Sequence, residues 1–239
     1  MRRGHYAVAG LTPGAPEIPE FFIATQIVKP SAISHWSAMS HHGFTEQIPR
    51  TVTAITTKRV RNPAKPPLRA ASGMNKQHWE IGHVDYEFIY VLPAAFFGIE
   101  EIWLGEFFKV PITDKERTIL EGFIWPSYFG GLAVVLAILQ RHLAEIKLST
   151  LTAYARKYDT ATVIKRLGWA LERLATPPSE LKPLLEFPVK GYSALDPSLP
   201  MRGSHNRRWM IVDNLSARKT GDERVAIPDN TLTNTLTSR

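Results

Sequence analysis

The stretch SAISHWSAMSHHGFTEQIP, at Ser31–Pro49, decides the expected fold of the chain around it. Ser31 follows a proline and is a residue type that caps helices, which predicts a helix beginning at Ala32. Helical spacing places Trp36 on one face, toward the core, together with its neighbours Ile33 and Ser40. The same spacing leaves three histidines near the rim and the end of this helix: His35, His41 and His42.

Three residues near the end of this stretch indicate where the helix stops. Gly43 stands where the chain would leave the helix through a left-handed conformation. Phe44 follows and can fold back on the last helical turn. Pro49 prevents the segment from continuing as a helix. The stretch therefore predicts one short helix that ends before Gly43.

The segments around this helix predict strands first and helices later. A further helix is expected at Glu20–Lys29 and a proline-rich loop at Arg59–Gly73. Alternating residues predict strands at Thr51–Lys58 and Val84–Leu92. Further strands are expected at His78–Ile81 and, joined at Gly105, at Ile99–Leu104 and Phe107–Val110. This order favours an α+β fold, with a small mixed sheet followed by a helical half, over a doubly wound sheet.

The helical half begins at a predicted capping box, Thr113-Asp114-Lys115-Glu116, in which the hydroxyl of Thr113 and the carboxylate of Glu116 would satisfy free backbone N–H groups. Glu121, later in this helix, is expected to be solvated. Further helices are expected after Gly130-Gly131, from Ser149 or Thr150 to Tyr158, after Thr160 and at Leu181–Leu185, and a last strand at Asn206–Val212.

Composition limits the class of protein. The chain has 239 residues, of which 44% are apolar, so a sizeable core is possible. It has no cysteine, which excludes disulfides and thiolate metal sites and fits a reducing cytoplasm. The N-terminus lacks the apolar run of a secretory signal, and Leu132–Leu139 is too short to span a bilayer. We therefore expect a cytoplasmic protein without a membrane partner.

The charge is strongly basic and unevenly distributed. The formal net charge is +7 and the sequence pI is about 9.7. Between Arg50 and Lys76 there are seven basic residues and no acid, whereas acids predominate from Glu80 to Glu106. A basic block of this kind is typical of phosphate contact. The alternative is a solvated loop without a nucleic-acid partner.

Several motifs in a fixed order resemble one known family. SHWSAMSHHGFTEQIP is followed by ITDKERTILEGF at Ile112–Phe123, SYFGG at Ser127–Gly131, KRLGWALERL at Lys165–Leu174 and NRRWMIVDNL at Asn206–Leu215. This series resembles the AbiEi-type antitoxins of type IV toxin–antitoxin systems, which act in phage defence by abortive infection. The resemblance covers roughly residues 1–215.

The resemblance implies a domain arrangement. Family members begin with a winged helix-turn-helix whose last hairpin ends in an Arg-Gly-x-Tyr pattern, and Arg3-Gly4-His5-Tyr6 is similar to that end. Residues 1–12 would then be a remnant of this hairpin, without its preceding helices, and residues 13–215 the C-terminal antitoxin domain. Residues 216–239 are polar and are expected to be a disordered tail.

The resemblance also implies a function without catalysis. The chain would be an antitoxin and transcriptional regulator that binds its own promoter DNA. It would oppose a co-encoded nucleotidyltransferase-like toxin without a stable complex. The residues expected to contact nucleic acid are Arg2, Arg3, Lys58, Arg59, Arg61, Lys65, Arg69, Arg207 and Arg208. For Arg207 and Arg208, pairing with the acidic segment Glu80–Glu106 is an open alternative.

The motifs give little evidence for catalysis or for metal binding. His35, His41 and His42 lack the i, i+4 spacing of helical metal ligands, and no Gly-x-Ser-x-Gly elbow or phosphate-binding glycine loop is present. We therefore expect no catalytic residue, no metal and no cofactor. Two alternatives remain: a small hydrolase or transferase that uses the histidines of residues 32–42, and a basic domain that binds acidic protein partners.

Overall fold

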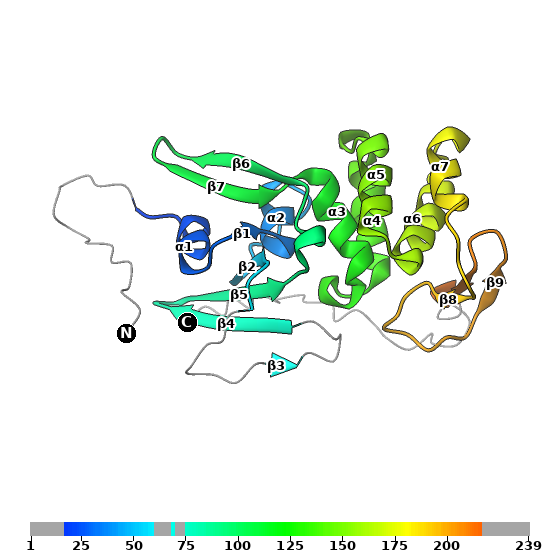
Figure 1. Cartoon of the computed structure of the whole chain (residues 1–239), viewed down its shortest axis with the longest axis horizontal. Coiled ribbons are helices and arrows are strands. Elements are labelled where there is room, and N and C mark those ends of the chain that lie inside the picture. Colours follow the sequence, from blue (N-terminus) through cyan, green and yellow to red (C-terminus); the bar gives the residue numbers. More distant parts are fainter. Residues whose placement is uncertain (1–16, 60–67, 70–74, 217–239) are drawn as a thin grey trace, which may run out of the picture.

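A computed structural model describes residues 17–59, 68–69 and 75–216, which form a sheet half and a helical half (Figure 1). The large sheet contains β1 (Ser31–Ile33), β2 (Thr51–Thr56), β3 (Leu68–Arg69), β4 (Asn75–Ile81), β5 (Val84–Tyr90), β6 (Ile99–Leu104) and β7 (Phe108–Thr113). Their order across the sheet is β3-β4-β5-β2-β1-β7-β6. Both parallel and antiparallel pairs occur, and the fold is α+β, as the order of elements predicted.

The centre of the sheet corrects the prediction of a helix beginning at Ala32. Ser31–Ile33 is strand β1, and all three residues are buried between β2 and β7. The hydroxyl of Ser31 donates to the carbonyl of Val28 and caps nothing. Ser34 occupies the N-cap position of α2 (His35–His41) instead. The Ser-Ala-Ile triplet is a strand because β2 and β7 pair with it on both sides.

The exit from α2 follows the prediction. Gly43 has a positive φ of 74°, which a residue without a side chain adopts at little cost. The backbone N–H of Phe44 donates to the carbonyl of Met39 over 2.8 Å, and the Phe44 ring is buried beside α4. α2 therefore ends with its following residue folded back, in contact with the helical half.

Helix α1 (Glu20–Ile27) covers one face of the large sheet. Ala24 and Val28 are buried against Ile33, Ala54 and side chains of β5 and β7. In Figure 1 this helix lies between the β6–β7 hairpin and the β4–β5 hairpin. On the other face, Ile55 and Ile89 pack with residues around two short 3-10 helices, η1 (Pro93–Ala95) and η2 (Pro126–Phe129).

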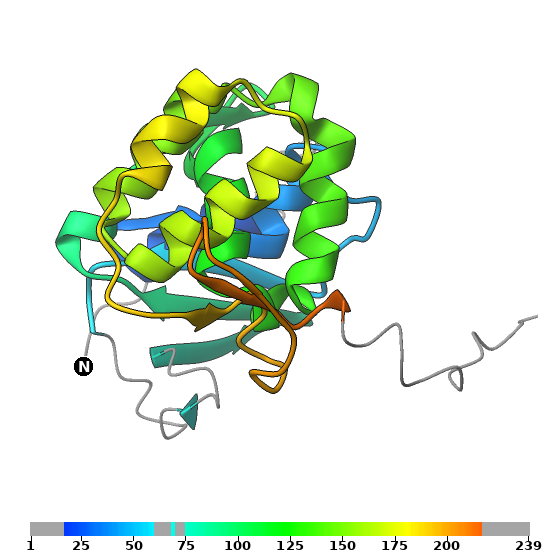
Figure 2. The same ribbon diagram turned by 90° about the vertical axis from the view of Figure 1, so that its right-hand side faces the viewer.

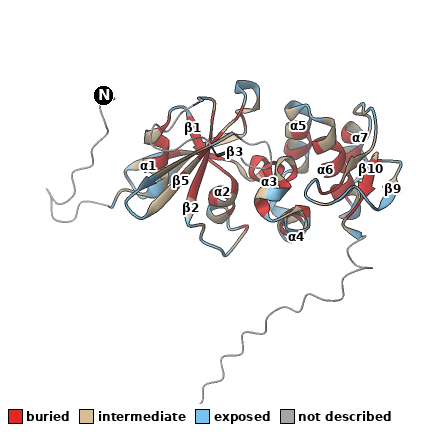
Figure 3. Ribbon diagram, turned by 90° about the horizontal axis from the view of Figure 1, so that it is seen from below, coloured by how far each residue is buried: buried red, intermediate tan, exposed pale blue. Residues whose placement is uncertain are grey.

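The helical half follows the sheet in the chain. It comprises α3 (Lys115–Ile124), α4 (Leu132–His142), α5 (Leu148–Tyr158), α6 (Ala161–Arg173) and α7 (Pro178–Leu185). Helix α3 packs against α2, α4, α5 and α6, so it joins the two halves. Figure 3 marks buried residues in red on both halves and on α3 between them.

The start of α3 differs from the predicted capping box. Asp114 is the N-cap residue, and its carboxylate accepts from the backbone N–H of Arg117 over 2.7 Å. The hydroxyl of Thr113 lies 2.8 Å from that of Thr118, and Glu116 accepts from the backbone N–H of Lys147. Because Thr113 is the last residue of β7, it cannot also occupy the cap position.

A small second sheet closes the far end of the helical half, which faces the viewer in Figure 2. Its strands are β8 (Ser193–Ala194), β9 (Ser204–Asn206) and β10 (Ile211–Asp213), in the order β8-β10-β9. The strand predicted at Asn206–Val212 is therefore two strands joined by a turn. Trp209, in that turn, is buried against Gly168 of α6.

Candidate functional site

Two of the predicted nucleic-acid residues lie at the end of β2. β2 ends at Thr56, and Lys58 and Arg59 follow it after one residue, Thr57; both cations are exposed. The guanidinium of Arg59 lies 5.0 Å from the ring centroid of Tyr90, at the end of the neighbouring strand β5. This stacking orients a positive charge at the edge of the sheet core while leaving it in contact with solvent.

Other predicted residues cannot be placed by their side chains. Arg2, Arg3, Arg61 and Lys65 lie outside the described residues. Arg69 belongs to β3, where its backbone is opposite that of Asn75 in β4. The basic block is therefore continuous with the β3–β4 edge of the large sheet. The predicted boundary between residues 12 and 13 and the predicted tail after Ser216 also lie outside the described residues.

Arg207 and Arg208 lie in the turn between β9 and β10, in the other sheet. Both are exposed. The Nε of Arg208 lies 2.6 Å from Oε1 of Glu172 in α6, and Glu172 also accepts from the indole N–H of Trp209. The alternative that pairs Arg208 with Glu80–Glu106 is wrong, because the acid that faces this turn comes from α6.

The three histidines do not converge on a common centre. His35 is fully buried, which corrects its predicted place at the rim of the helix. The Nε2 of His42 lies 2.7 Å from the carbonyl oxygen of Thr113, and the ring of His41 is exposed beside Phe21. Partial desolvation and the neighbouring His42 lower the pKa of His41. These positions do not support a catalytic centre built from the three histidines.

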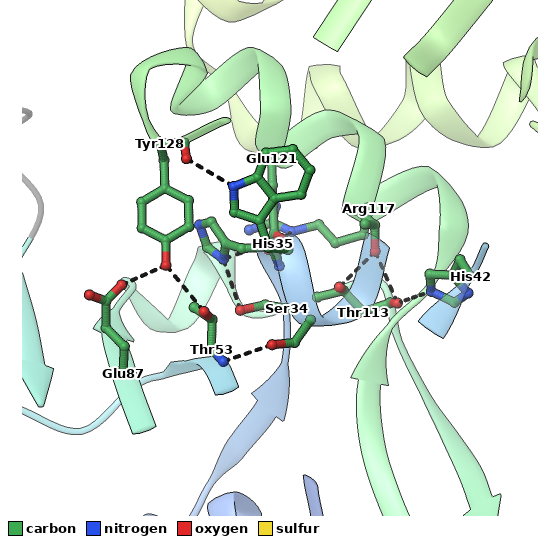
Figure 4. A network of polar contacts seen from close by, with 12 residues as sticks. Ser34, His35, His42, Thr53, Glu87, Thr113, Arg117, Glu121 and Tyr128 are labelled. Carbon is green, nitrogen blue, oxygen red and sulfur yellow. Dashed lines mark hydrogen bonds and ion pairs between the residues drawn. The ribbon is translucent and has the colours of Figure 1, made fainter. Parts of the chain in front are cut away.

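A buried cluster of charged residues occupies the junction of the two halves (Figure 4). Glu121 of α3 accepts a hydrogen bond from the backbone N–H of His35 over 2.9 Å. The Nδ1 of His35 lies 3.5 Å from the same carboxylate and 2.8 Å from the hydroxyl of Ser34. The Nε of Arg117 lies 3.5 Å from the other oxygen of Glu121. The side chains of His35, Arg117 and Glu121 are all fully buried.

Aromatic rings surround this cluster. The guanidinium carbon of Arg117 lies 4.8 Å from the ring centroid of Phe97 and 5.6 Å from that of Tyr158. The ring of His35 stacks on Trp125 at 5.0 Å. Among the described residues the three guanidinium nitrogens make no hydrogen bond. Glu121 and the ring faces are therefore the main electrostatic partners of this buried cation.

Burial dominates the titration of Glu121. Desolvation raises the pKa of its carboxyl to about 7, against the opposing effects of Arg117 and of the hydrogen bond from His35. Near neutral pH both protonation states of this buried carboxyl are therefore populated. The prediction of a solvated Glu121 is wrong, because this face of α3 packs onto α2.

Tyr128 extends the same network to the large sheet. Its hydroxyl donates to Oε1 of Glu87 over 2.7 Å and lies 3.1 Å from the hydroxyl of Thr53. Its carbonyl accepts from the indole N–H of Trp36 over 3.1 Å. Burial and the carboxylate of Glu87 raise the pKa of the phenol, so it remains a donor. These bonds connect η2 to β2, β5 and α2.

Burial limits the reactions in which this cluster could take part. A general acid or base needs contact with substrate, and the carboxylate and imidazole here are enclosed by protein. In the ranges 17–59, 68–69 and 75–216 no group of three or more His, Asp or Glu side chains is arranged to hold a metal ion. The described contacts of this cluster are those of a structural junction.

A shallow groove lies between α5 and α7. It has a volume of about 360 Å³ and is lined by Arg156, Ser179, Lys182, Pro183, Glu186, Phe187 and Pro188. Lys182 pairs with Glu186 within the groove at 3.8 Å. None of these lining residues is buried, and none of the site residues predicted from the sequence is among them.

Comparison with known proteins identifies a similar fold. No family model and no curated protein matches the chain. Among solved structures, the crystal structure of the RV2827C protein from Mycobacterium tuberculosis is similar, with a TM-score of 0.54 and 15% sequence identity. The match covers 82% of this chain and 66% of that protein. This likeness shows a shared fold and nothing about activity.

Within the described parts of the chain, no helix is both long and apolar enough to cross a bilayer.

Proposed function

We propose that the chain is an AbiEi-like antitoxin and transcriptional autoregulator of a type IV toxin–antitoxin system. The ordered motifs that resemble this family support the proposal, and so does the basic block at Arg50–Lys76, whose cations would contact DNA. In this proposal the protein acts in the cytoplasm, binds its own promoter and opposes a co-encoded nucleotidyltransferase-like toxin. It has no catalytic residue of its own.

The observation that supports DNA contact best is the position of Lys58 and Arg59. Both are exposed at the end of β2, and the segment that follows them has further cations and no acid. Cations in such a segment neutralise phosphates and release counterions, which gives affinity without reading base sequence. Arg59 is held on Tyr90, so it loses less side-chain entropy on binding.

The hydrolase or transferase alternative is less favoured by the geometry. It requires His35 and an acid to face a substrate, whereas His35 and Glu121 are fully buried at a packed junction. His41 and His42 contact other groups. The interaction-domain alternative uses the same cations, so only a comparison of ligands separates it from DNA binding.

The DNA role is tested by measuring binding to the native promoter across a salt series. We expect Lys58→Ala/Arg59→Ala to weaken binding to all sequences alike, because phosphate contacts do not read bases. The slope of log K against log salt should flatten by about 0.9 for each lost contact.

The matched control is Lys182→Ala/Lys190→Ala, which removes two exposed charges from another part of the surface. Equal losses in both variants would contradict a local site at the end of β2. Competition by heparin but not by promoter DNA would favour the interaction-domain alternative.

The antitoxin role needs a separate measurement. Co-expression with the neighbouring toxin should restore growth, and the Lys58→Ala/Arg59→Ala variant should still restore it if DNA binding and antitoxicity are separate. Growth arrest in the presence of the unmodified chain would argue against the antitoxin role.

A further inference from the structure

The edge of the large sheet that is formed by β6 has unusual surface chemistry. Strand β6 is the last strand in the sheet order, and within the described residues it pairs only with β7. It is six residues long and contains no proline, so its outward N–H and C=O groups are suited to pair with another strand. Edges of this kind bind extended peptides by adding a strand.

The β6–β7 hairpin is acidic, although the chain as a whole is basic. Residues 99–113 contain three glutamates, Glu100, Glu101 and Glu106, and one lysine, which gives a net charge of −2. Lys109 pairs with Glu101 across the hairpin. All three glutamates are exposed.

Two large aromatic side chains accompany these acids. Trp103 is 62% exposed and Phe107 is 67% exposed. Trp103 lies opposite Lys109, near the turn at Gly105, and Phe107 immediately precedes β7. Exposed aromatics beside carboxylates are suited to guanidinium groups, which stack on the rings and pair with the acids.

The hairpin is anchored at its other face. The ring of Phe108 lies 4.9 Å from that of Phe22 in α1, and Val110 and Ile112 are fully buried in the same core. The projecting hairpin can be followed at the top left of the sheet in Figure 1. Because its base is packed, the hairpin backbone that carries Trp103 would lose little entropy on binding.

We propose that the β6 edge is a docking site for an extended Lys/Arg-rich segment of a partner protein. The segment would pair with β6 through its backbone, and its basic side chains would contact the glutamates, Trp103 and Phe107. This proposal goes beyond the antitoxin function and does not depend on DNA binding.

Charge argues against the other occupants of this edge. Nucleic acid and anionic lipid surfaces would be repelled by the three glutamates. A second copy that paired through its own β6 would bring the glutamates of both strands together, which is unfavourable. The same carboxylates that oppose self-pairing select a cationic strand.

The test uses three synthetic heptapeptides with a fluorescent label: Lys-Val-Arg-Val-Lys-Val-Arg, the same sequence with all basic residues replaced by Glu, and the basic peptide with alternate backbone nitrogens methylated. Anisotropy titration of the full chain at low salt should show binding of the first peptide only. Hydrogen exchange at the outward β6 amides should slow when this peptide is added.

Substitutions test whether the basic peptide binds at the β6 edge. Trp103→Ala and, separately, Glu106→Lys should each weaken binding of the basic peptide, and the two together by about tenfold or more. Ile48→Ala is the matched control, since Ile48 is 89% exposed and lies between α2 and β2. It should bind like the unmodified chain.

Four results would overturn the proposal. They are equal binding of the N-methylated peptide, no binding of the basic peptide, β6 amides that already exchange slowly in the free monomer, and self-association of the unmodified chain that Glu106→Lys abolishes. Equal binding of the N-methylated peptide would mean that charge attraction alone, without strand pairing, holds the peptide. Slow exchange of the β6 amides in the free monomer would mean that another segment of this chain already pairs with β6. Self-association that Glu106→Lys abolishes would mean that a second copy occupies the edge.

Discussion

Two ion pairs with the same sequence spacing occupy opposite environments in this protein. Arg117 and Glu121 lie four residues apart in α3, and Lys182 and Glu186 lie four residues apart in α7. The first pair is completely buried, whereas the side chains of the second are 72% and 65% exposed. The comparison shows that helical spacing determines which side chains come into contact. Tertiary packing determines how strongly that contact affects the stability of the protein.

The difference follows from solvation. A buried charge loses its hydration, so removal of its partner leaves an uncompensated charge in a medium of low dielectric constant. An exposed pair gains little, because water screens both charges and long side chains lose entropy when they pair. Glu121 also accepts the backbone N–H of His35, so its charge connects α3 to the start of α2.

The largest expected effect is that of Arg117→Met. This change leaves Glu121 buried without its cation, and we expect the free energy of unfolding at pH 8 to fall by about 3–5 kcal/mol. Urea denaturation followed by circular dichroism measures it. The double variant Arg117→Met/Glu121→Gln should recover part of the loss, because no charge then remains buried. A double variant as unstable as the sum of the single ones would show that charge compensation is not the cause.

The second effect is a dependence of stability on pH that comes from Glu121. Its folded pKa, about 7, lies above its reference value of 4.5, so between these values the folded state binds a proton that the unfolded state does not. This contribution to stability is complete below about pH 4.5 and is lost as the pH rises to about 7. The slope is at most about 1.4 kcal/mol per pH unit.

Glu121→Gln isolates this contribution. The pH dependence of unfolding in the variant should lack the decrease that Glu121 causes, while contributions from other groups, including His41, cancel in the difference between the two proteins. Urea midpoints measured every half unit from pH 5 to 8 give the comparison. Parallel curves for the two proteins would mean that Glu121 does not titrate in this range.

The smallest expected effect is that of Lys182→Ala. Its partner Glu186 remains hydrated after the change, so the free energy of unfolding should change by no more than about 0.5 kcal/mol. The same denaturation experiment, repeated at high salt, should give the same difference within error. A loss as large as that of Arg117→Met would remove the distinction between the two pairs.

The sequence predicts most elements of the fold because their patterns are local. Alternation in Thr51–Thr56 and the turn at Gly105 after Ile99–Leu104 place strands correctly, and the apolar spacing of Ala161–Arg173 places α6. Gly43 ends α2 as expected, since the requirement for a positive φ belongs to the residue itself. These features depend on neighbours a few residues away.

The errors occur where distant segments meet. Ser31–Ile33 fits the start of a helix, but β2 and β7 pair with it on both sides. Thr113 fits a capping box, yet it ends a strand, and Asp114 caps α3. Glu121 and His35, 86 residues apart, gave no sign of their contact, although Glu121 at four residues from Arg117 was a usable signal for a paired acid.

The sequence by itself determined the α+β order of elements, the basic block after β2 and the acidic hairpin at β6–β7. These depend on residue types and short spacings, which the chain specifies directly. Only the tertiary structure decided that the acidic hairpin forms one edge of the sheet while Lys58 and Arg59 follow its central strand β2, and that Arg117 and Glu121 are buried while Lys182 and Glu186 are not. The physical reason is that burial and dielectric environment are set by segments far along the chain, which no local pattern specifies.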